Sequence, residues 1–234
     1  GDAIYVDGNY VGTSPITSNL TYGSHNIKAE RNGKEVSKTI SVSQSGGENN
    51  VKLAFVQEIN GHEYVDLGLS VKWATCNVGA SKPEDYGNYY AWGETKTKSD
   101  YSSSNSVTSG KSFSDIGGKS QYDAARANWG GTWRLPTKAE LQELKKKCTW
   151  KWTTQNGVKG YKVTGPNGNS IFLPAAGYRL GSSLYYAGEY GYYWSSTPDE
   201  SYSNRAYYLY FNSSVQGVDW HYRSRGLSVR PVAE

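Results

Sequence analysis

The sequence lacks several features that define whole classes of protein. Among its 234 residues are two cysteines, three histidines and no methionine, and its apolar runs are only a few residues long. Two cysteines are too few for a disulfide-stapled small domain or for most metal clusters, and no apolar run is long enough for a membrane-spanning helix. A net charge of +4 is too weak to indicate a nucleic-acid partner, and we expect none.

Motifs of the common enzyme classes are also missing. With only His25, His62 and His221, the zinc-protease pattern His-Glu-x-x-His is impossible, and no Gly-x-Ser-x-Gly occurs. The carboxylates show no spacing that indicates the paired acids of a glycan hydrolase. We therefore expect no enzymatic activity, no catalytic residue, no metal site and no cofactor.

The first 55 residues form a segment of distinct composition, because they hold none of the eight tryptophans and neither cysteine. Asp7-Gly8 lies between apolar alternations, which is a strong hairpin signal, and Asn32-Gly33 lies in a second turn. We expect strands over residues 3–6, 10–12, 25–30, 35–42 and 51–55. They predict a small all-β sandwich over residues 1–55, followed by a linker over residues 56–60.

The order of residues in this first segment resembles the PEGA domain. Asp-Gly follows the first strand, Gly12 and Pro15 come next, and Gly23-Ser24-His25 opens the following strand. The resemblance implies a small, surface-exposed β module that is joined to another domain. We expect His25 to be a structural strand residue, because no second metal ligand lies near it in the sequence.

Residues 61–234 combine two helix signals with many strand signals. Ser120 is the predicted N-cap of a helix over residues 121–129 that ends at Gly130-Gly131. Thr137 and Glu140 form a capping box for a second helix, which runs to about Lys147. Residues 93–119 predict a long loop, and after residue 161 short β runs alternate with glycine turns. These patterns predict an α+β domain with two helices and an irregular antiparallel sheet.

Separated blocks of this second part resemble the Fibrobacter succinogenes major paralogous domain. The most widely shared blocks are Trp133-Arg134-Leu135-Pro136 and Gly226-Leu227-Ser228-Val229-Arg230-Pro231. The resemblance implies a C-type-lectin-like fold, related to retroelement-diversified variable proteins. Many members are exported surface proteins of gut and rumen anaerobes, which implies a location on the cell surface or outside the cell, at the outer-membrane face.

The start of the chain and its cysteines bear on this location. The sequence begins with Gly1-Asp2 and has no methionine, so we expect the natural N-terminus, with any leader or lipoprotein-like anchor, to lie upstream. Contact with a membrane would come only through that anchor. Cys76 and Cys148 lie beside tryptophan-rich segments, and either a disulfide or two buried free thiols would fit there. An exported protein favours the disulfide, which we predict.

Tyrosine is concentrated near the C-terminus. Residues 185–225 hold 10 of the 21 tyrosines, and residues 163–234 hold none of the lysines, so that their basic residues are all arginine. This composition is typical of binding surfaces, which are rich in tyrosine, serine, glycine, asparagine and arginine and poor in lysine. A packed, purely structural cluster stays open on composition alone. Strand alternation places Leu209 and Phe211 inside, with Tyr208 and Tyr210 on the other face.

The resemblance extends to this segment, which is the variable one in the diversified proteins. It implies a ligand-binding set made of Tyr208, Tyr210, Asn212, Asp219, His221, Tyr222 and Arg225. Phe211, Trp220 and Arg223 would be scaffold, and we expect Trp220 in the core.

The patterns together predict a non-enzymatic cell-surface or secreted protein for ligand binding or adhesion. Its partner would be a glycan or a host or bacterial surface protein, held by the tyrosine- and arginine-rich surface. The alternative is a structural or assembly component of the bacterial envelope without a specific ligand site.

Overall fold

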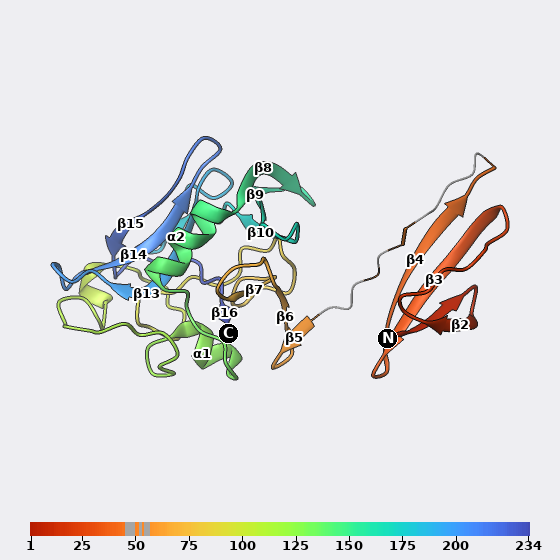
Figure 1. Ribbon diagram of the computed structural model, residues 1–234. Helices are drawn as coiled ribbons and strands as arrows, with labels where there is room; N and C mark the ends of the chain where they lie inside the picture. The colour runs from red at the N-terminus through yellow and green to blue at the C-terminus, as the bar shows by residue number, and fades with distance from the viewer. Residues whose placement is uncertain (45–49, 52, 54–56) are drawn as a thin grey trace. The chain divides into compact units, whose positions relative to one another are not determined.

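The computed structural model describes residues 1–44, 50, 51, 53 and 57–234 (Figure 1). The chain divides into two compact units, Gly1–Val56 and Gln57–Glu234, which are described separately below as unit 1 and unit 2. Both are built mainly from antiparallel β-sheets, with two α-helices among the described residues. No helix in the described ranges is long and apolar enough to cross a membrane.

Unit 1 is a four-stranded antiparallel sheet. Its strands are β1 (Ala3–Val6), β2 (Asn9–Thr13), β3 (Gly23–Arg31) and β4 (Lys34–Val42), in the order β2-β1-β3-β4. Asp7-Gly8 and Asn32-Gly33 all have positive φ, as tight hairpin turns require, so both predicted hairpins are confirmed. Within the described residues of unit 1 there is one sheet, not the two of the predicted sandwich. The strand expected over residues 51–55 falls mostly outside the described residues.

His25 ties the first hairpin to the third strand. Its Nδ1 lies 2.7 Å from Asp7 Oδ2, and its Nε2 lies 2.9 Å from the Thr21 carbonyl oxygen. The Asp7 side chain also accepts the Asn26 backbone N–H at 2.8 Å. The hydrogen bond to Asp7 is the largest cause that raises the pKa of His25. His25 is therefore a structural residue in unit 1, as the sequence predicts.

Unit 2 contains four further antiparallel sheets, in the strand orders β16-β7-β6-β5, β10-β9-β8, β11-β12 and β13-β14-β15. Its strands are β5 (Gln57–Ile59), β6 (His62–Val65), β7 (Lys72–Ala74), β8 (Thr149–Gln155), β9 (Val158–Thr164), β10 (Ser170–Pro174), β11 (Tyr178–Leu180), β12 (Ser183–Tyr185), β13 (Gly191–Pro198), β14 (Arg205–Phe211), β15 (Gln216–Tyr222) and β16 (Val232–Ala233).

The start of unit 2 differs from the sequence prediction. Residues 57–59, which the prediction placed in a linker, form β5 and pair with β6. The reason is the Asn60-Gly61 turn, where φ is 50° and 79°, because Asn-Gly in this conformation closes a two-residue hairpin. This turn signal is visible in the sequence and the prediction overlooked it.

The two helices lie where the sequence places them, with one correction. Helix α2 (Lys138–Lys147) has the predicted capping box, in which Thr137 Oγ1 accepts the Glu140 N–H and Glu140 accepts the Thr137 N–H. Helix α1 (Ala124–Trp129) ends before Gly130 as predicted, but its N-cap is Asp123 and not Ser120. The buried Asp123 carboxylate accepts the first free N–H groups of the helix and also that of Leu135 at 2.9 Å. A carboxylate that satisfies several buried donors defines this helix start better than a serine does.

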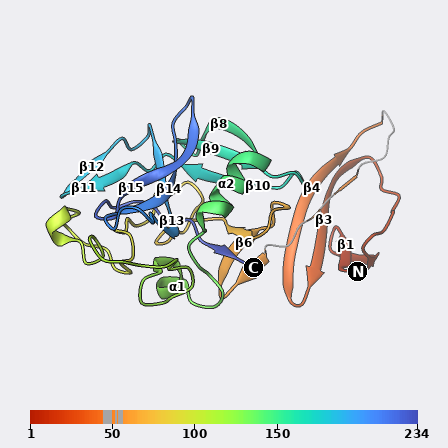
Figure 2. The same ribbon diagram turned by 60° about the vertical axis from the view of Figure 1, so that its left-hand side comes forward.

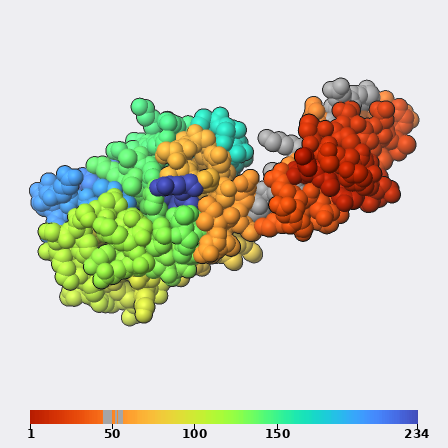
Figure 3. Space-filling model, turned by 60° about the horizontal axis from the view of Figure 1, so that its bottom comes forward, coloured from red at the N-terminus to blue at the C-terminus, as the bar shows by residue number. Residues whose placement is uncertain are grey.

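The last residues of the chain complete the first sheet of unit 2. Strand β16 pairs with β7, and Val232 also bridges to Arg134 (Figure 3, dark blue between orange and green). Just before β16, the Arg230 side chain is 1% exposed. It donates to Asn77 Oδ1 and to the carbonyl oxygens of Ala74, Thr75 and Phe172, at 2.6–3.0 Å. Arg230 thus binds the C-terminal segment to the end of β7 and to the middle of β10.

The sheet β13-β14-β15 has a hydrophobic cluster on each of its faces. Trp194 and Ala206 belong to one cluster, whereas Leu209 and Phe211 belong to the other, together with Leu141 of α2. Helix α2 packs on this second face (Figure 1). The predicted inward orientation of Leu209 and Phe211 is confirmed.

Residues 93–119 form a long loop, as predicted, that holds only the short 3-10 helix η1 (Ser103–Asn105). The loop is fastened from the C-terminal side by the buried Arg223. Its Nη1 donates to the carbonyl oxygens of Thr108 and Lys111, at 3.2 and 2.8 Å. The loop is therefore part of the folded body of unit 2.

The predicted disulfide is wrong, because Cys76 and Cys148 are both free thiols. Cys76 follows β7, and its Sγ lies 3.6 Å from Thr75 Oγ1. Cys148 is the C-cap of α2 and packs against the cluster beneath that helix. The two residues follow different elements, β7 and α2, so their shared proximity to tryptophan in the sequence does not imply contact. Burial raises the pKa of both thiols, to about 11 for Cys148, so neither is a reactive thiolate at neutral pH.

Candidate ligand-binding site

The register of β13-β14-β15 separates the tyrosine-rich segment into two faces. Tyr208 pairs with Trp194 and Asp219, Tyr210 pairs with Tyr192 and Gly217, and Ala206 pairs with His221. Directly opposed residues in neighbouring strands lie on the same face. Tyr192, Tyr208, Tyr210, Asp219 and His221 therefore share one face of the sheet.

Aromatic rings form a continuous group on this face, which we call the tyrosine cluster. Its members are Tyr178, Tyr185, Tyr186, Tyr190, Tyr192, Tyr208, Tyr210 and His221. Each ring lies 5.2–6.4 Å, between centroids, from at least one other member. Figure 2 shows the hairpin β11-β12 beside the sheet, and this hairpin and the turn after it carry four of these rings. Two successive elements of the chain, the hairpin and the three-stranded sheet, thus build one aromatic surface.

The hydroxyl groups of this cluster differ from those of three core tyrosines. In the core, Tyr89, Tyr101 and Tyr193 each donate to a backbone carbonyl oxygen, at 2.5–2.6 Å. Over the described part of the chain, none of the seven cluster hydroxyls has a hydrogen-bond partner, and none is both buried and unpaired. Tyrosines that only fill a core normally have their hydroxyls paired. The cluster therefore packs its rings and leaves its hydroxyls for water or a ligand.

Local backbone geometry positions two of the rings. Tyr186 has φ of 56°, a left-handed conformation that is unusual for a bulky residue, and it is 50% exposed. Its carbonyl oxygen accepts the backbone N–H groups of Glu189 and Tyr190. Tyr210 lies over Gly217, where an added Cβ would come within 2.5 Å of the Tyr210 ring. Strained backbone such as that of Tyr186 is concentrated at functional sites, which supports a role for this surface.

His221 is an uncharged member of the cluster at neutral pH. Its Nδ1 accepts the Tyr222 backbone N–H at 2.9 Å. Burial lowers the pKa of His221 to about 4, with a further lowering effect from Arg225 that Asp219 opposes. Burial likewise raises the pKa values of Tyr192 and Tyr208. The centre of the cluster is therefore neutral over the physiological pH range.

The structure brings together part of the residue set that the sequence predicts. Tyr208, Tyr210 and His221 are cluster members, and Asp219 is exposed beside them. Arg225 follows β15 and is near enough to affect the pKa values of Tyr178 and His221.

Two predicted ligand residues lie elsewhere. Tyr222 pairs with Arg205 and lies on the opposite face of the sheet. Asn212 lies in the β14–β15 turn, where its Oδ1 accepts the backbone N–H groups of Ser214 and Val215 at 2.9 and 3.1 Å. Its oxygen is used to hold the turn, which is a structural role.

The scaffold prediction is right for Phe211 and Arg223, which are buried, and wrong for Trp220. Trp220 is 37% exposed, because β15 is the last strand of its sheet and the apolar residues of α2 pack farther along that face, in the cluster of Leu209 and Phe211. Sequence reasoning also missed five cluster members as site residues, Tyr178, Tyr185, Tyr186, Tyr190 and Tyr192. Their signal was the high local tyrosine content, which includes four of the five.

The side chains of the described residues were compared with the needs of a metal centre. Among the described residues, no group of three or more His, Cys, Asp or Glu side chains could hold a metal ion. The site is therefore described by ring faces, hydroxyl groups and the charges at its edge.

Comparison with known proteins gives two family matches. Residues 1–59 match the PEGA domain, and residues 136–232 match a family described as Domain of unknown function (DUF8237). The chain thus carries the PEGA domain that its motif predicts, and such domains typically occur in extracellular or periplasmic proteins.

The second match covers every residue of the tyrosine cluster, and its description assigns no function. No curated protein and no solved structure matches the chain. The resemblance to the major paralogous domain stays a prediction.

Proposed function

We propose that this chain is a non-enzymatic cell-surface or secreted binding protein, and that its tyrosine cluster contacts a glycan or a surface protein. The observation that carries the proposal is the set of seven tyrosine hydroxyls without a partner in the described chain, on rings that are already packed together. Such an arrangement offers a ligand both apolar faces and hydrogen-bonding groups.

The energetics of binding favour this kind of surface. Tyrosine provides a large contact area with only two side-chain torsions to restrict, so that ordering it on binding costs little entropy. The cluster rings already restrain one another, which reduces this cost further. Sugar C–H faces and apolar protein side chains both pack on aromatic rings, while the hydroxyls exchange hydrogen bonds with polar ligand atoms. No proton transfer or nucleophile is needed for such a function.

The location and the fold form part of the same proposal. The PEGA domain is typical of extracellular or periplasmic proteins, and we place this protein on the cell surface or outside the cell. We assign the C-type-lectin-like fold to residues 61–234. This assignment is supported by two α-helices beside small antiparallel sheets, and by the pairing of β16 with β7, which joins the end of the unit to its beginning.

Replacement of cluster hydroxyls tests the proposal without disturbing ring packing. The complete 234-residue chain would be screened on glycan arrays and on panels of immobilised host and bacterial surface proteins. For each ligand found, the double variant Tyr186→Phe/Tyr210→Phe is compared with Tyr10→Phe/Tyr22→Phe, which removes two hydroxyls from the exposed tyrosines of unit 1.

We expect the cluster variant to weaken binding by roughly tenfold to a hundredfold, since each hydrogen bond contributes about 1 kcal/mol. The control variant should bind as the unaltered chain does. Equal binding by both variants would refute the cluster as the site. A folded chain without any ligand on either panel would instead favour a structural component of the envelope.

A further inference from the structure

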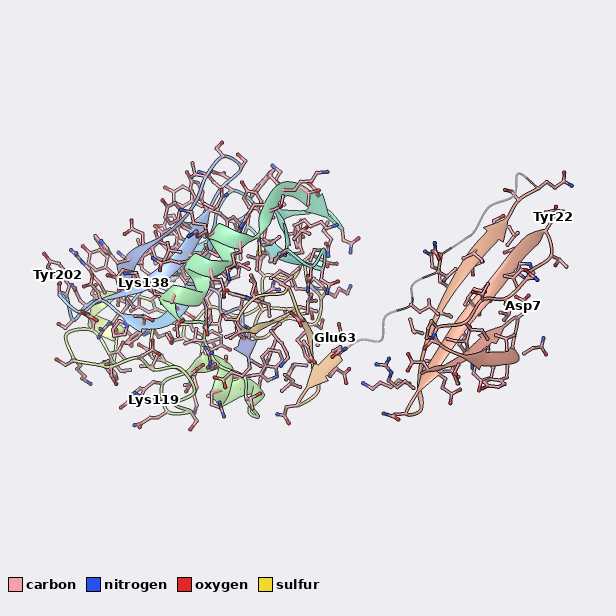
Figure 4. The ribbon with its side chains drawn as sticks, viewed as in Figure 1. Asp7, Tyr22, Glu63, Lys119, Lys138 and Tyr202 are labelled. Carbon is pink, nitrogen blue, oxygen red and sulfur yellow. The ribbon has the colours of Figure 1, made fainter. Side chains whose placement is uncertain are left out.

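The face of β14-β15 opposite the tyrosine cluster carries a second exposed group, which we call the arginine patch. It consists of Tyr202, Arg205, Tyr207, Trp220 and Tyr222, together with Lys138 at the start of α2. Arg205 pairs with Tyr222, and Tyr207 pairs with Trp220, in two neighbouring rows of the same face. Figure 4 labels Tyr202, in the loop between β13 and β14, and Lys138, on α2.

Arg205 is held between aromatic rings with its charge unmatched. Its guanidinium carbon lies 3.6 Å from the centre of the Trp220 ring and 4.0 Å from that of Tyr202. Its Nε is buried and has no hydrogen-bond partner, and no carboxylate of the described chain forms an ion pair with the guanidinium. Stacking fixes the plane of the guanidinium, and because Nε is buried, its two terminal Nη groups are the donors left for a ligand.

Lys138 adds a second unmatched positive charge. Its ammonium lies 3.5 Å from the centre of the Tyr207 ring and makes no ion pair with a described residue. It is the first residue of α2, where a cation is opposed by the positive end of the helix dipole. Lysine at this position lowers the stability of the helix. Binding of an anionic ligand would account for a positive charge at this place.

The patch therefore combines two cations with exposed ring faces. Tyr202, Trp220 and Tyr222 are 53%, 37% and 38% exposed. The row of Arg205 and the row of Tyr207 are two residues apart along the strand, which corresponds to about 7 Å. Lys138 lies over Tyr207, so the two cations belong to neighbouring rows of the surface. A guanidinium fork matches a carboxylate in a bidentate manner. In a uronic acid, the carboxylate is attached directly to a pyranose ring whose C–H face fits an aromatic side chain, whereas an acidic peptide side chain has no such ring.

We infer that the arginine patch is a second binding surface, and that it takes an acidic polysaccharide built from uronic acids. Arg205 binds one carboxylate, a sugar ring packs against Trp220 or Tyr222, and Lys138 faces the carboxylate of a neighbouring unit. This surface is separate from the tyrosine cluster, because the two lie on opposite faces of one sheet.

The test uses the complete chain and polygalacturonate, with the methyl-esterified polymer as its uncharged counterpart. Binding is measured by calorimetry or biolayer interferometry at low salt and at about 0.5 M salt, where exposed charges are strongly screened. Arg205→Gln and Lys138→Gln are compared with Lys151→Gln and Lys159→Gln, which remove charge from exposed positions on β8 and β9. A polyglutamate peptide of similar charge serves as the protein-like probe.

We expect polygalacturonate to bind and the methyl ester not to bind. Arg205→Gln should weaken binding about tenfold or more, as the loss of a charge-assisted hydrogen bond does, and Lys138→Gln should weaken it less. The β8 and β9 variants and Tyr186→Phe/Tyr210→Phe should bind normally, which separates this inference from the function of the tyrosine cluster.

Three results would overturn the inference. They are equal affinity for the methyl ester, equal weakening by the β8 and β9 variants, and tighter binding of polyglutamate than of polygalacturonate with the same dependence on Arg205. If Arg205→Gln does not fold, Lys138→Gln and the ester comparison still decide, because the Lys138 side chain takes no part in the capping box of Thr137 and Glu140.

Discussion

Protonation of His221 should make the stability of unit 2 depend on pH in a defined direction. Its ring lies among Tyr178, Tyr192 and Tyr208, and burial lowers its pKa from 6.5 to about 4. In the unfolded chain the same group takes up a proton near pH 6.5. The unfolded state therefore binds more protons between these values, so stability falls as the pH decreases from about 6.5 toward 4.

The size of the effect follows from the two pKa values. At pH 5 the unfolded imidazole is almost fully protonated and the folded one is mostly neutral. The difference corresponds to a loss of about 2 kcal/mol between pH 7.5 and pH 5. Below about pH 4 this group causes no further loss, because both states are then protonated.

Urea unfolding followed by tryptophan fluorescence measures this effect in unit 2 alone, because all eight tryptophans lie after residue 56. The control is His221→Phe, which keeps a ring in the cluster and cannot be protonated. It should lose about 2 kcal/mol less than the unaltered chain over the same pH interval. Equal losses in the two proteins would show that His221 takes up its proton at the same pH in the folded and the unfolded chain, and would refute the lowered pKa of the buried ring.

Three further predictions concern both units. His25 of unit 1 should make stability depend on pH in the opposite direction, because Asp7 raises its pKa. Its stabilising contribution is complete below pH 6.5 and disappears as the pH rises through the folded pKa. NMR titration of His25 in the unaltered chain and in Asp7→Asn would measure this shift. Gly217→Ala should leave the fold intact but displace the Tyr210 ring, seen as weaker ligand binding with an unchanged urea midpoint. Arg230→Met should destabilise unit 2 by about 3–5 kcal/mol, since four buried hydrogen bonds are lost, and a shift below 1 kcal/mol would contradict this role.

Local signals explain which elements could be predicted from the sequence. The capping box of Thr137 and Glu140 acts within one turn of the chain, so it identified α2 correctly. Strand alternation likewise placed Leu209 and Phe211 inside. The start of α1 was missed because Asp123 also binds Leu135, which is a contact that no local pattern shows.

The composition of the site was predictable only in part. Tyr208, Tyr210 and His221 lie on one strand pair, so alternation applies to them. Tyr178 and Tyr186 reach the cluster through the hairpin β11-β12, whose position depends on the bridges of Gly177 to Gly191 and of Arg179 to Gly226. Such long-range pairing has no signature in a single sequence. The exposure of Trp220 was missed for a related reason. A large apolar side chain favours the core, but which part of a sheet is covered by a helix depends on the tertiary fold.

The pairing of β16 with β7 has a consequence for the order in which the chain folds during synthesis. All four described strands of unit 1 lie within residues 3–42, so this sheet can form while the rest of the chain is still being made. In unit 2, β7 can pair with β16 only after Val232 and Ala233 have been synthesised. The carbonyl oxygens of Ala74 and Thr75 likewise receive their hydrogen bonds only after Arg230 has been added. The unit cannot close its first sheet until its last residues have left the ribosome. A ribosome stalled before residue 230 should therefore carry a folded unit 1 and a unit 2 that is still open to proteases.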